Sequence, residues 1–461
     1  WRALAPLLDG PACDRFAEVC KATLQGQGSP RLRSGIVLSL ARLGNSDRLI
    51  AVEPRPSQRA AQLVQEALPP VLARWHDLAD LLTRLAEAAP EAFLACVEYT
   101  LSPPAGPVVI WRSEPQTQDE PTIFAISRAL GLLALDVSLL PQVTLLLARL
   151  AAYCQPSKSN QRTGHPVHTL EEIFDPRWPK TNATIEERLN ALEPLNQQVP
   201  SLAFTLFARL VAVRGAIVLN LRRPEGLRLA LPSMDRGASA EAQYGQQATL
   251  LGWLKMLAGS DGERWATLVR LKSHMFVDLY LDLLRDLQKR NLQVLTDPDA
   301  LWAALRESLS EYHLPVAGGS SGTMKEPRSE NSQRLAEIRE LSQTLYQTLT
   351  PTDFTAAHAW LFGDNPAPPG RYASVEARVA QVQQAQAACV DALCQRSDRW
   401  LQLARLLPNA RNSAFHLAEL LDHSHWADEL ERDFTRLHEL NPDFAVLFLA
   451  RRLSPRGWPA M

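Results

Sequence analysis

Two histidines three residues apart, His165 and His168, come nearest to a chemical site in this sequence. Imidazole and carboxylate groups three or four residues apart on one helix can bind zinc, and Glu172 lies four residues after His168. Pro166 stands between the histidines, however, and a proline interrupts a regular helix, so one helix interior cannot hold both. Thr169 is expected to cap a short helix, with Glu172 completing the capping box. We therefore predict a structural role and no metal site.

The nucleophilic side chains form no catalytic pattern. Neither a nucleophile elbow, nor a glycine-rich phosphate loop with Lys-Ser/Thr, nor an HExxH motif occurs. We therefore expect no cofactor, no ATP binding and no reaction by this chain alone. A metal- or Cys-dependent helical enzyme domain near residues 165–175 stays open as an alternative. The six cysteines lie mostly in apolar helical stretches, typical of reduced thiols in a cytosolic protein, at positions 13, 20, 96, 154, 389 and 394.

One local group of arginines could contact nucleic acid. It begins at Arg209 and continues with Arg214, Arg222, Arg223 and Arg228. A charged loop in solvent is the commoner explanation of such a run. The formal net charge of -2 gives no general attraction to nucleic acid or acidic membranes. We therefore do not expect a nucleic-acid partner, and a nucleic-acid-binding helical array that uses Arg209–Arg228 is the second alternative.

The bulk properties indicate a cytoplasmic protein with a sizeable core. Hydrophobic residues make up 46% of the 461 positions, the ordinary value for globular proteins. No apolar run reaches the roughly 18 residues that a membrane-spanning helix needs, and no signal peptide is visible. The chain begins at Trp1 rather than Met, so we expect it to be part of a longer protein whose own N-terminal module is missing here.

Amphipathic helical patterns fill most of the chain, and alternating strand patterns are nearly absent. The prediction is an all-α fold. We expect N-terminal helical hairpins over 1–153 and a central helical region over 154–314. A flexible, Gly/Ser-rich linker is predicted over 315–331, and C-terminal helical hairpins over 332–461.

A pattern around three helix-opening prolines indicates how these helices pair. Pro90, Pro200 and Pro442 each follow a Leu by five residues and a Leu or Phe by eight. Each precedes apolar residues by four and by seven, so both helices present apolar faces to one another. The spacing predicts αα-hairpins. The distance between the three instances is irregular, so we expect an irregular α-solenoid of stacked hairpins rather than a fixed-period array.

Helix starts and tryptophans give further expectations. Asp297-Pro298 and Thr350-Pro351 each pair a capping residue with a proline at the first helical position. Several tryptophans lie within apolar periodicity or beside proline, and we expect them to anchor helices to one another. They are Trp75, Trp178, Trp265, Trp302 and Trp360.

Short motifs spread over most of the chain carry a family resemblance. The chain resembles the helical C-terminal regions of large bacterial proteins with an N-terminal effector or STAND-type (NACHT-like) NTPase module, several of which are antiviral sensors. The motifs are LRSG at 32–35, APEAFL at 89–94, HPVHTLEEIF at 165–174, WPKTNA at 178–183, ERL at 187–189, LWAALR at 301–306 and, after Thr350-Pro351, WLF at 360–362.

The resemblance implies ligand sensing and self-association rather than a reaction. In such proteins the helical part recognises a foreign protein, and the NTPase part oligomerises. No binding residue can be carried over from the resemblance. The expected function is therefore a non-enzymatic helical sensor or scaffold region that binds a protein partner, such as a phage protein, within a larger bacterial protein.

Overall fold

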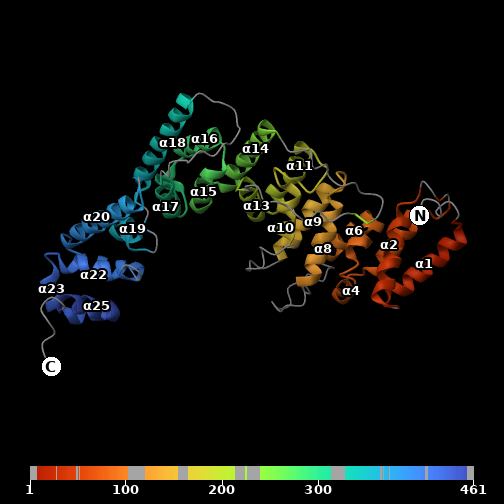
Figure 1. Cartoon of the computed structure of the whole chain (residues 1–461), viewed down its shortest axis with the longest axis horizontal. Coiled ribbons are helices and arrows are strands. Elements are labelled where there is room, and N and C mark those ends of the chain that lie inside the picture. Colours follow the sequence, from red (N-terminus) through yellow and green to blue (C-terminus); the bar gives the residue numbers. More distant parts are fainter. Residues whose placement is uncertain are drawn as a thin grey trace. The chain divides into compact units, whose positions relative to one another are not determined.

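The computed structural model describes most of the chain, and the described residues are mostly helical (Figure 1), which confirms the all-α prediction. The chain divides into two units, Trp1–Leu257 and Ala258–Met461. No described helix is both long and apolar enough to cross a membrane. The structure describes residues 8–26, 28–47, 50, 52–101, 120–153, 165–212, 224–225, 239–312, 328–363, 366, 368–372, 374–410 and 414–453.

The regular elements in the described residues of unit 1 are all helices. The last of these helices, α14, ends one residue beyond the boundary between the units. The helices are α1 Gly10–Leu24, α2 Pro30–Gly44, α3 Pro56–Ala67, α4 Leu72–Asp77, α5 Leu82–Ala88, α6 Pro90–Leu101, α8 Glu120–Leu133, α9 Leu140–Tyr153, α10 Pro166–Phe174, α11 Ile185–Leu192, α12 Leu195–Gln198, α13 Pro200–Ala212 and α14 Ala240–Ala258.

Unit 2 adds short 3-10 helices and two three-residue strands to its α-helices. Its elements are α15 Gly262–Arg270, η3 Leu271–His274, α16 Val277–Gln288, η4 Leu292–Val294, α17 Pro298–Leu309, β1 Ser310–Tyr312, α18 Arg328–Leu349, α19 Phe354–His358, η5 Ala359–Phe362, β2 Gly370–Tyr372, α20 Val375–Cys394, α21 Arg399–Leu406, η6 Leu407–Ala410, α22 Ala414–Asp422, α23 Ala427–Arg432, α24 Phe434–Leu440 and α25 Pro442–Leu453.

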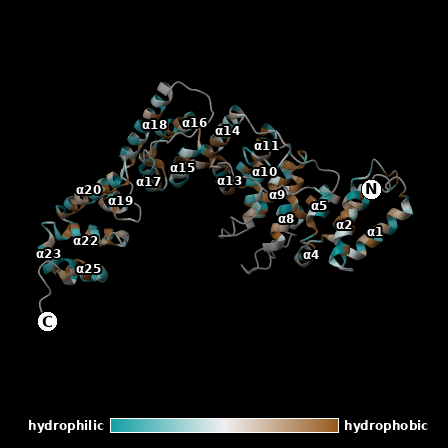
Figure 2. Cartoon of the chain, viewed as in Figure 1, coloured by the Kyte–Doolittle hydropathy of each residue, from teal (hydrophilic) through white to brown (hydrophobic). Residues whose placement is uncertain are grey.

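Amphipathic helices supply the core of each unit. Figure 2 shows hydrophobic and hydrophilic residues side by side on the helices of both units. In unit 1 the largest fully buried side chains are Trp75, Phe93, Phe174 and Phe207. Burial of one such aromatic side chain stabilises the fold by about 1.5–3 kcal/mol, so these residues are major contributors to the core.

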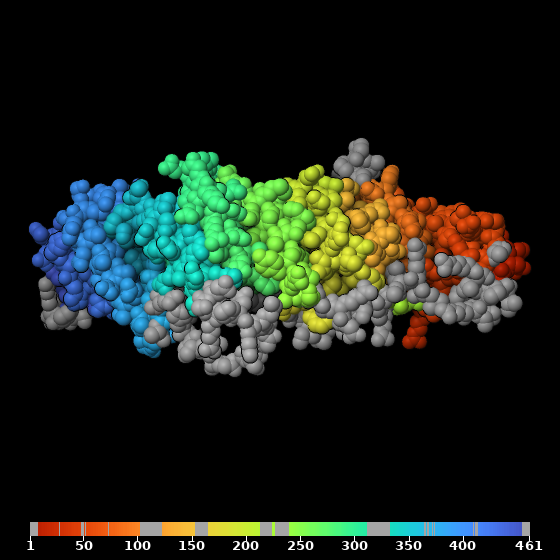
Figure 3. Space-filling model, turned by 90° about the horizontal axis from the view of Figure 1, so that it is seen from above, coloured from red at the N-terminus to blue at the C-terminus, as the bar shows by residue number. Residues whose placement is uncertain are grey.

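The helices of unit 1 pack against neighbours close to them in the chain. Helix α1 contacts α2 and α3, α3 contacts α5 and α6, and α6 contacts α9, which in turn contacts α10, α11 and α13. Figure 3 shows the same order within this unit, because successive segments of sequence lie side by side. Each helix therefore buries its apolar face mainly against helices that follow or precede it by a few elements.

The three predicted helix-opening prolines begin helices α6, α13 and α25 and close the predicted αα-hairpins. The residue before each proline lies outside the α region, because proline disfavours the α conformation at the position before it. At all three corners its N–H donates to the carbonyl of the Leu five residues before the proline, and that Leu is buried. The corner residues are Ala89, Val199 and Asn441, and the leucines are Leu85, Leu195 and Leu437.

The third corner differs from the prediction in the face that its second helix buries. Val446, four residues after Pro442, was expected to face α24 but is exposed. Phe444, Ala445 and Phe448 are buried instead. Helix α25 packs mainly against α22 and α24, and no later helix in the described chain covers its remaining face. The first two hairpins have such a covering helix, so the same position is buried there.

Of two predicted helix starts, the one at Pro298 is placed correctly and the one at Pro351 is not, and both helices are capped differently from the prediction. Asp297 is the residue before α17, with Pro298 at the first position, yet its φ is +51° and its side chain makes no capping hydrogen bond. Helix α19 begins at Phe354 rather than near Pro351, because Asp353 is the cap and accepts from the Ala356 N–H at 3.0 Å. Thr350 instead donates its hydroxyl to a carbonyl of the preceding helix.

The connector around residues 165–187 corrects two further expectations. Helix α10 begins at Pro166 with His165 as its cap, so Thr169 lies inside the helix and is not the cap. Trp178 was expected to anchor the connector, but its side chain is 45% exposed. A capping box opens the next helix, α11, as the Thr184-x-x-Glu187 spacing predicts: Thr184 accepts from the Glu187 N–H, and the Glu187 carboxylate accepts from the Thr184 N–H at 2.7 Å.

The end of the predicted linker and a short sheet differ from expectation. Helix α18 begins at Arg328, so the last residues assigned to the linker over 315–331 are helical, and residues 313–327 lie outside the described chain. Strands β1 and β2 pair in parallel, with Ser310 opposite Gly370. Strands of three residues are too short to leave an alternating pattern, so no sequence signal predicts them.

Candidate interaction surface

His165 and His168, the two histidines three residues apart, do not form a set of metal ligands. His165 is buried at the start of α10, where its Nδ1 accepts from the Val167 N–H at 3.3 Å. His168 lies inside the helix with its Nδ1 3.8 Å from Glu172 Oε1, and the same oxygen binds Lys180 Nζ at 2.7 Å. Glu172 thus neutralises a lysine of the connector. In the described part of the chain, no group of three or more His, Cys, Asp or Glu side chains is placed to hold a metal ion.

Only the first arginine of the predicted basic cluster lies in the described chain. Arg209, on α13, donates to Glu171 Oε1 on α10 at 2.7 Å, and it therefore ties two helices together. Arg214, Arg222, Arg223 and Arg228 lie outside the described residues. Their contact with nucleic acid stays a prediction.

The cysteines in the described chain are free thiols, and burial raises the pKa of Cys20 and Cys389 most strongly. It raises the pKa of Cys20 and of Cys389 to about 12. Cys389 and Cys394, predicted to be core thiols, are both buried in α20. A nucleophilic cysteine needs a pKa below its ordinary value, since the thiolate is the reactive form. These two environments therefore favour inert thiols.

We expect a thiol reagent such as DTNB at pH 8 to leave Cys20 and Cys389 unmodified in the folded protein. With a pKa of about 12, roughly one thiol in ten thousand is ionised at that pH. Peptide mass spectrometry before and after unfolding in guanidinium checks this. Stability should also fall above about pH 9, because the unfolded thiols lose protons there while the folded ones retain them. Rapid modification of either thiol in the folded protein would contradict the buried placement.

Helix α20 carries an apolar stripe that is only half covered. Val375, Val379, Val382, Gln386 and then Cys389 and Leu393 follow one another at alternating intervals of four and three residues. This spacing places them along one face of the helix, as in a coiled-coil seam. We call these six residues the α20 seam. Its second half, from Gln386 onward, is buried among η5, α21 and α22.

The first half of the α20 seam leaves the core and continues into solvent. No residue from Val375 to Ala385 is buried, and Val375 is 60% and Val379 47% exposed. The junction is at Gln386, whose buried amide donates to the Leu361 carbonyl at 2.7 Å. The geometry therefore presents two to three helical turns whose apolar stripe no helix of the described chain covers.

Local interactions keep this uncovered half helical. Ser374 caps the helix by accepting from the Ala377 N–H at 3.2 Å. Glu376 adds a negative charge in the first turn, and the Ser374 hydroxyl lowers the pKa of that carboxyl. Arg378 donates to the Pro366 carbonyl at 2.8 Å, which ties the first turns to the segment before β2. The exposed turns are thus held in place without burying the valines.

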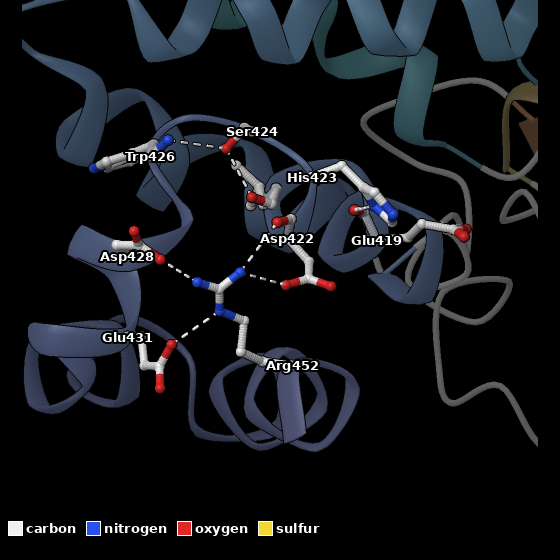
Figure 4. A network of polar contacts seen from close by, with 9 residues as sticks. Glu419, Asp422, His423, Ser424, Trp426, Asp428, Glu431 and Arg452 are labelled. Carbon is white, nitrogen blue, oxygen red and sulfur yellow. Dashed lines mark hydrogen bonds and ion pairs between the residues drawn. The ribbon is translucent and has the colours of Figure 1, made fainter. Parts of the chain in front are cut away.

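Ion pairs between Arg452 and three carboxylates connect the last helices of unit 2 (Figure 4). Arg452, on α25, donates through Nη1 to Asp422 at 3.1 Å, through Nε to Glu431 at 2.9 Å, and through Nη2 to Asp428. Its side chain is 12% exposed. The hydrogen bonds to these carboxylates, that of Glu431 foremost, raise the pKa of Arg452. This network joins α25 to the end of α22 and to α23.

Comparison with known proteins gives no relative. No family model, no curated protein and no solved structure matches the chain. The function proposed below therefore rests on the arrangement of the chain's own residues.

The α20 seam was not identified from the sequence, although a signal for it exists. The alternation of four and three residues is readable from Val375 to Leu393. The sequence does not reveal which half is covered, because that depends on η5, α21 and α22 folding back on the second half only.

Proposed function

We propose that this chain is a non-enzymatic helical scaffold that binds a protein partner, and that the exposed half of the α20 seam is a docking helix. The observation that carries the proposal is the continuation of the seam past the core into solvent. Helix-in-groove recognition uses anchors at this spacing, here Val375, Val379 and Val382. The proposed occupant is an apolar face on the partner that takes these three valines.

Helix propensity supports this role for the valines. Valine is a poorer helix former than alanine by about 0.5 kcal/mol per residue, so three valines weaken an exposed helix that gains nothing from their burial. The surrounding positions are rich in alanine and glutamine, which form helices well. In the exposed half of the helix, valine occurs only at the seam positions. This distribution is explained if these valines pack against a partner that binds there.

We expect the double substitution Val375→Glu and Val379→Glu to abolish partner binding without unfolding the chain. The two charges enter the seam where the helix is exposed, so the core is unaffected. Proximity cross-linking in cells that produce the protein, followed by mass spectrometry, compares partners of the wild type and the variant. Circular dichroism verifies the fold.

The matched control places the same two charges on the opposite face of the same helix. Gln381→Glu and Gln384→Glu lie there at exposed positions, and they should leave the partner bound. A partner that is retained by the seam variant, or lost equally with the control, would overturn the docking role of α20. Sedimentation of the purified chain distinguishes a different protein from a second copy of this chain as the occupant.

The wider proposal concerns the parent protein. The hairpins would form an irregular α-solenoid, a proposal that the chain-order packing of unit 1 supports. The scaffold would belong to a larger cytoplasmic bacterial protein with a STAND/NACHT-like module, and its partner would be a foreign protein. A pull-down with the longer parent protein against phage structural proteins tests this setting. Absence of binding in that assay, with binding of a host protein through α20, would confine the function to the scaffold alone.

A further inference from the structure

Arg306 on α17 is a buried cation that forms no close ion pair with a carboxylate of the described chain, although the adjacent Glu307 stabilises its charge from a distance. Its side chain is 8% exposed, and its Nε is buried without a hydrogen-bond acceptor among the described residues. The adjacent Glu307 points its carboxylate to Arg270, whose Nε lies 3.0 Å away. Burial lowers the pKa of Arg306, yet a guanidinium stays protonated in proteins.

Aromatic rings enclose the Arg306 guanidinium. Its central carbon lies 4.3 Å from the ring centre of Trp360, on η5, and 5.1 Å from that of Trp302, one turn earlier on α17. Trp302 in turn stacks on Tyr346 of α18, with ring centres 5.5 Å apart. The rings attract the cation through their faces and supply no acceptor for the buried Nε–H.

Trp302 adds a second donor of the same kind. Its side chain is 4% exposed, and its indole Nε1 is buried without an acceptor in the described chain. Of the other buried tryptophans, Trp75 donates to the Pro69 carbonyl and Trp265 to the Gly259 carbonyl, each at 3.0 Å, whereas the indole Nε1 of Trp426 also lacks an acceptor among the described residues. A buried donor left without an acceptor is costly, so two on one helix face call for an explanation.

The other arginines that lie over aromatic rings in the described chain each have a polar partner. Arg290 over Trp265 donates to a carbonyl at 3.1 Å, and the rest pair with carboxylates. Those are Arg396 with Asp398, Arg399 with Glu429, Arg436 with Asp433 and Arg451 with Glu419. Stacking on a ring is therefore usual in unit 2, and lack of an acceptor distinguishes Arg306.

We propose that Arg306 and Trp302 form an oxyanion site that takes a carboxylate or phosphate group. The two residues are four apart on α17, so their side chains project from the same face. A guanidinium with covered faces offers its edge, which is the geometry that binds two oxygens of a carboxylate or phosphate. A bound oxyanion supplies the missing counter-charge and accepts from the donors that the fold leaves unmatched.

The test is a titration of the full chain with sodium phosphate and, separately, with sodium acetate at constant ionic strength held by chloride. Binding is followed by calorimetry and by the fluorescence change of the tryptophans. We expect saturable binding of at least one oxyanion in the millimolar range, weakened at least tenfold by Arg306→Gln. Saturation by phosphate alone, by acetate alone or by both supports the site and assigns the class of oxyanion.

Two further variants keep the test independent of folding and of partner docking. Trp302→Phe retains the stack on Tyr346 but removes the indole donor, and it should weaken binding about threefold. Arg290→Gln removes a stacked arginine that already has its acceptor, and it should leave binding within twofold, as should the α20 seam variant. No saturable binding beyond chloride, or binding unchanged by both Arg306→Gln and Trp302→Phe, would overturn the proposal.

Discussion

Replacing Gly44 with alanine is expected to lower the free energy of unfolding by about 3 kcal/mol, the upper part of the range for overpacked cores. Gly44 ends α2 where α2 crosses α5, and a Cβ there would overlap the Ala88 carbonyl oxygen and lie 3.0 Å from Ala60 Cβ. A backbone oxygen cannot move aside without shifting α5. Urea denaturation followed by circular dichroism measures the loss.

A second glycine in the same helix provides the control. An alanine Cβ at Gly35 meets no atom within 4 Å, so Gly35→Ala should stabilise the protein by about 1 kcal/mol through helix propensity alone. The opposite signs separate the effect of packing from that of backbone entropy. Equal changes in the two variants would mean that α2 and α5 are not in close contact at Gly44.

The helical elements could be predicted because their signals are local. A proline that opens a helix fixes its own φ and restricts the residue before it, so the corners at Pro90, Pro200 and Pro442 follow from sequence alone. The Thr184-x-x-Glu187 box is equally local and holds in the structure. Such features depend on a few neighbouring residues and not on the rest of the fold.

Choices between neighbouring local signals were less predictable. Thr350 and Asp353 can both cap a helix, and Asp353 takes that role in the structure. Asp353 also pairs with Arg405 of α21 at 3.3 Å. This contact cannot be predicted from the residues around Asp353, because Arg405 is distant in the sequence. The exposure of Trp178 also depends on distant elements. Its apolar ring predicts burial, but no helix of the described chain covers it fully.

Neither candidate site could be located from sequence, because both depend on contacts between distant elements. The seam of α20 is visible as a spacing, but its exposed half is defined by what η5, α21 and α22 leave uncovered. The surroundings of Arg306 combine residues of α17, α18 and η5 that are up to 58 positions apart, from Trp302 to Trp360. The sequence identified Trp302 and Trp360 as anchors without indicating the cation between them.

Arg452→Met is expected to lower the free energy of unfolding of the C-terminal helices by about 2 kcal/mol, less than for a fully buried ion pair because the network is partly hydrated. Methionine keeps the helix propensity and most of the side-chain volume, so the change removes the charge and its hydrogen bonds. Asp422, nearly as buried as Arg452, then loses this cation. Hydrogen exchange of the amides of α25 should rise before that of α20, because α25 is held by α22, α24 and this network.

Arg432→Met tests whether the position of the charge matters. Arg432 is exposed on α23, and its Nε donates to the Asp428 carbonyl at 3.0 Å, so it lies beside the network without neutralising any of the three carboxylates. Its loss should change stability by less than about 0.5 kcal/mol. Similar losses for the two variants would show that net charge, and not the specific contacts of Arg452, holds the last hairpin. A large loss for Arg452→Met alone assigns that role to its contacts with Asp422, Asp428 and Glu431.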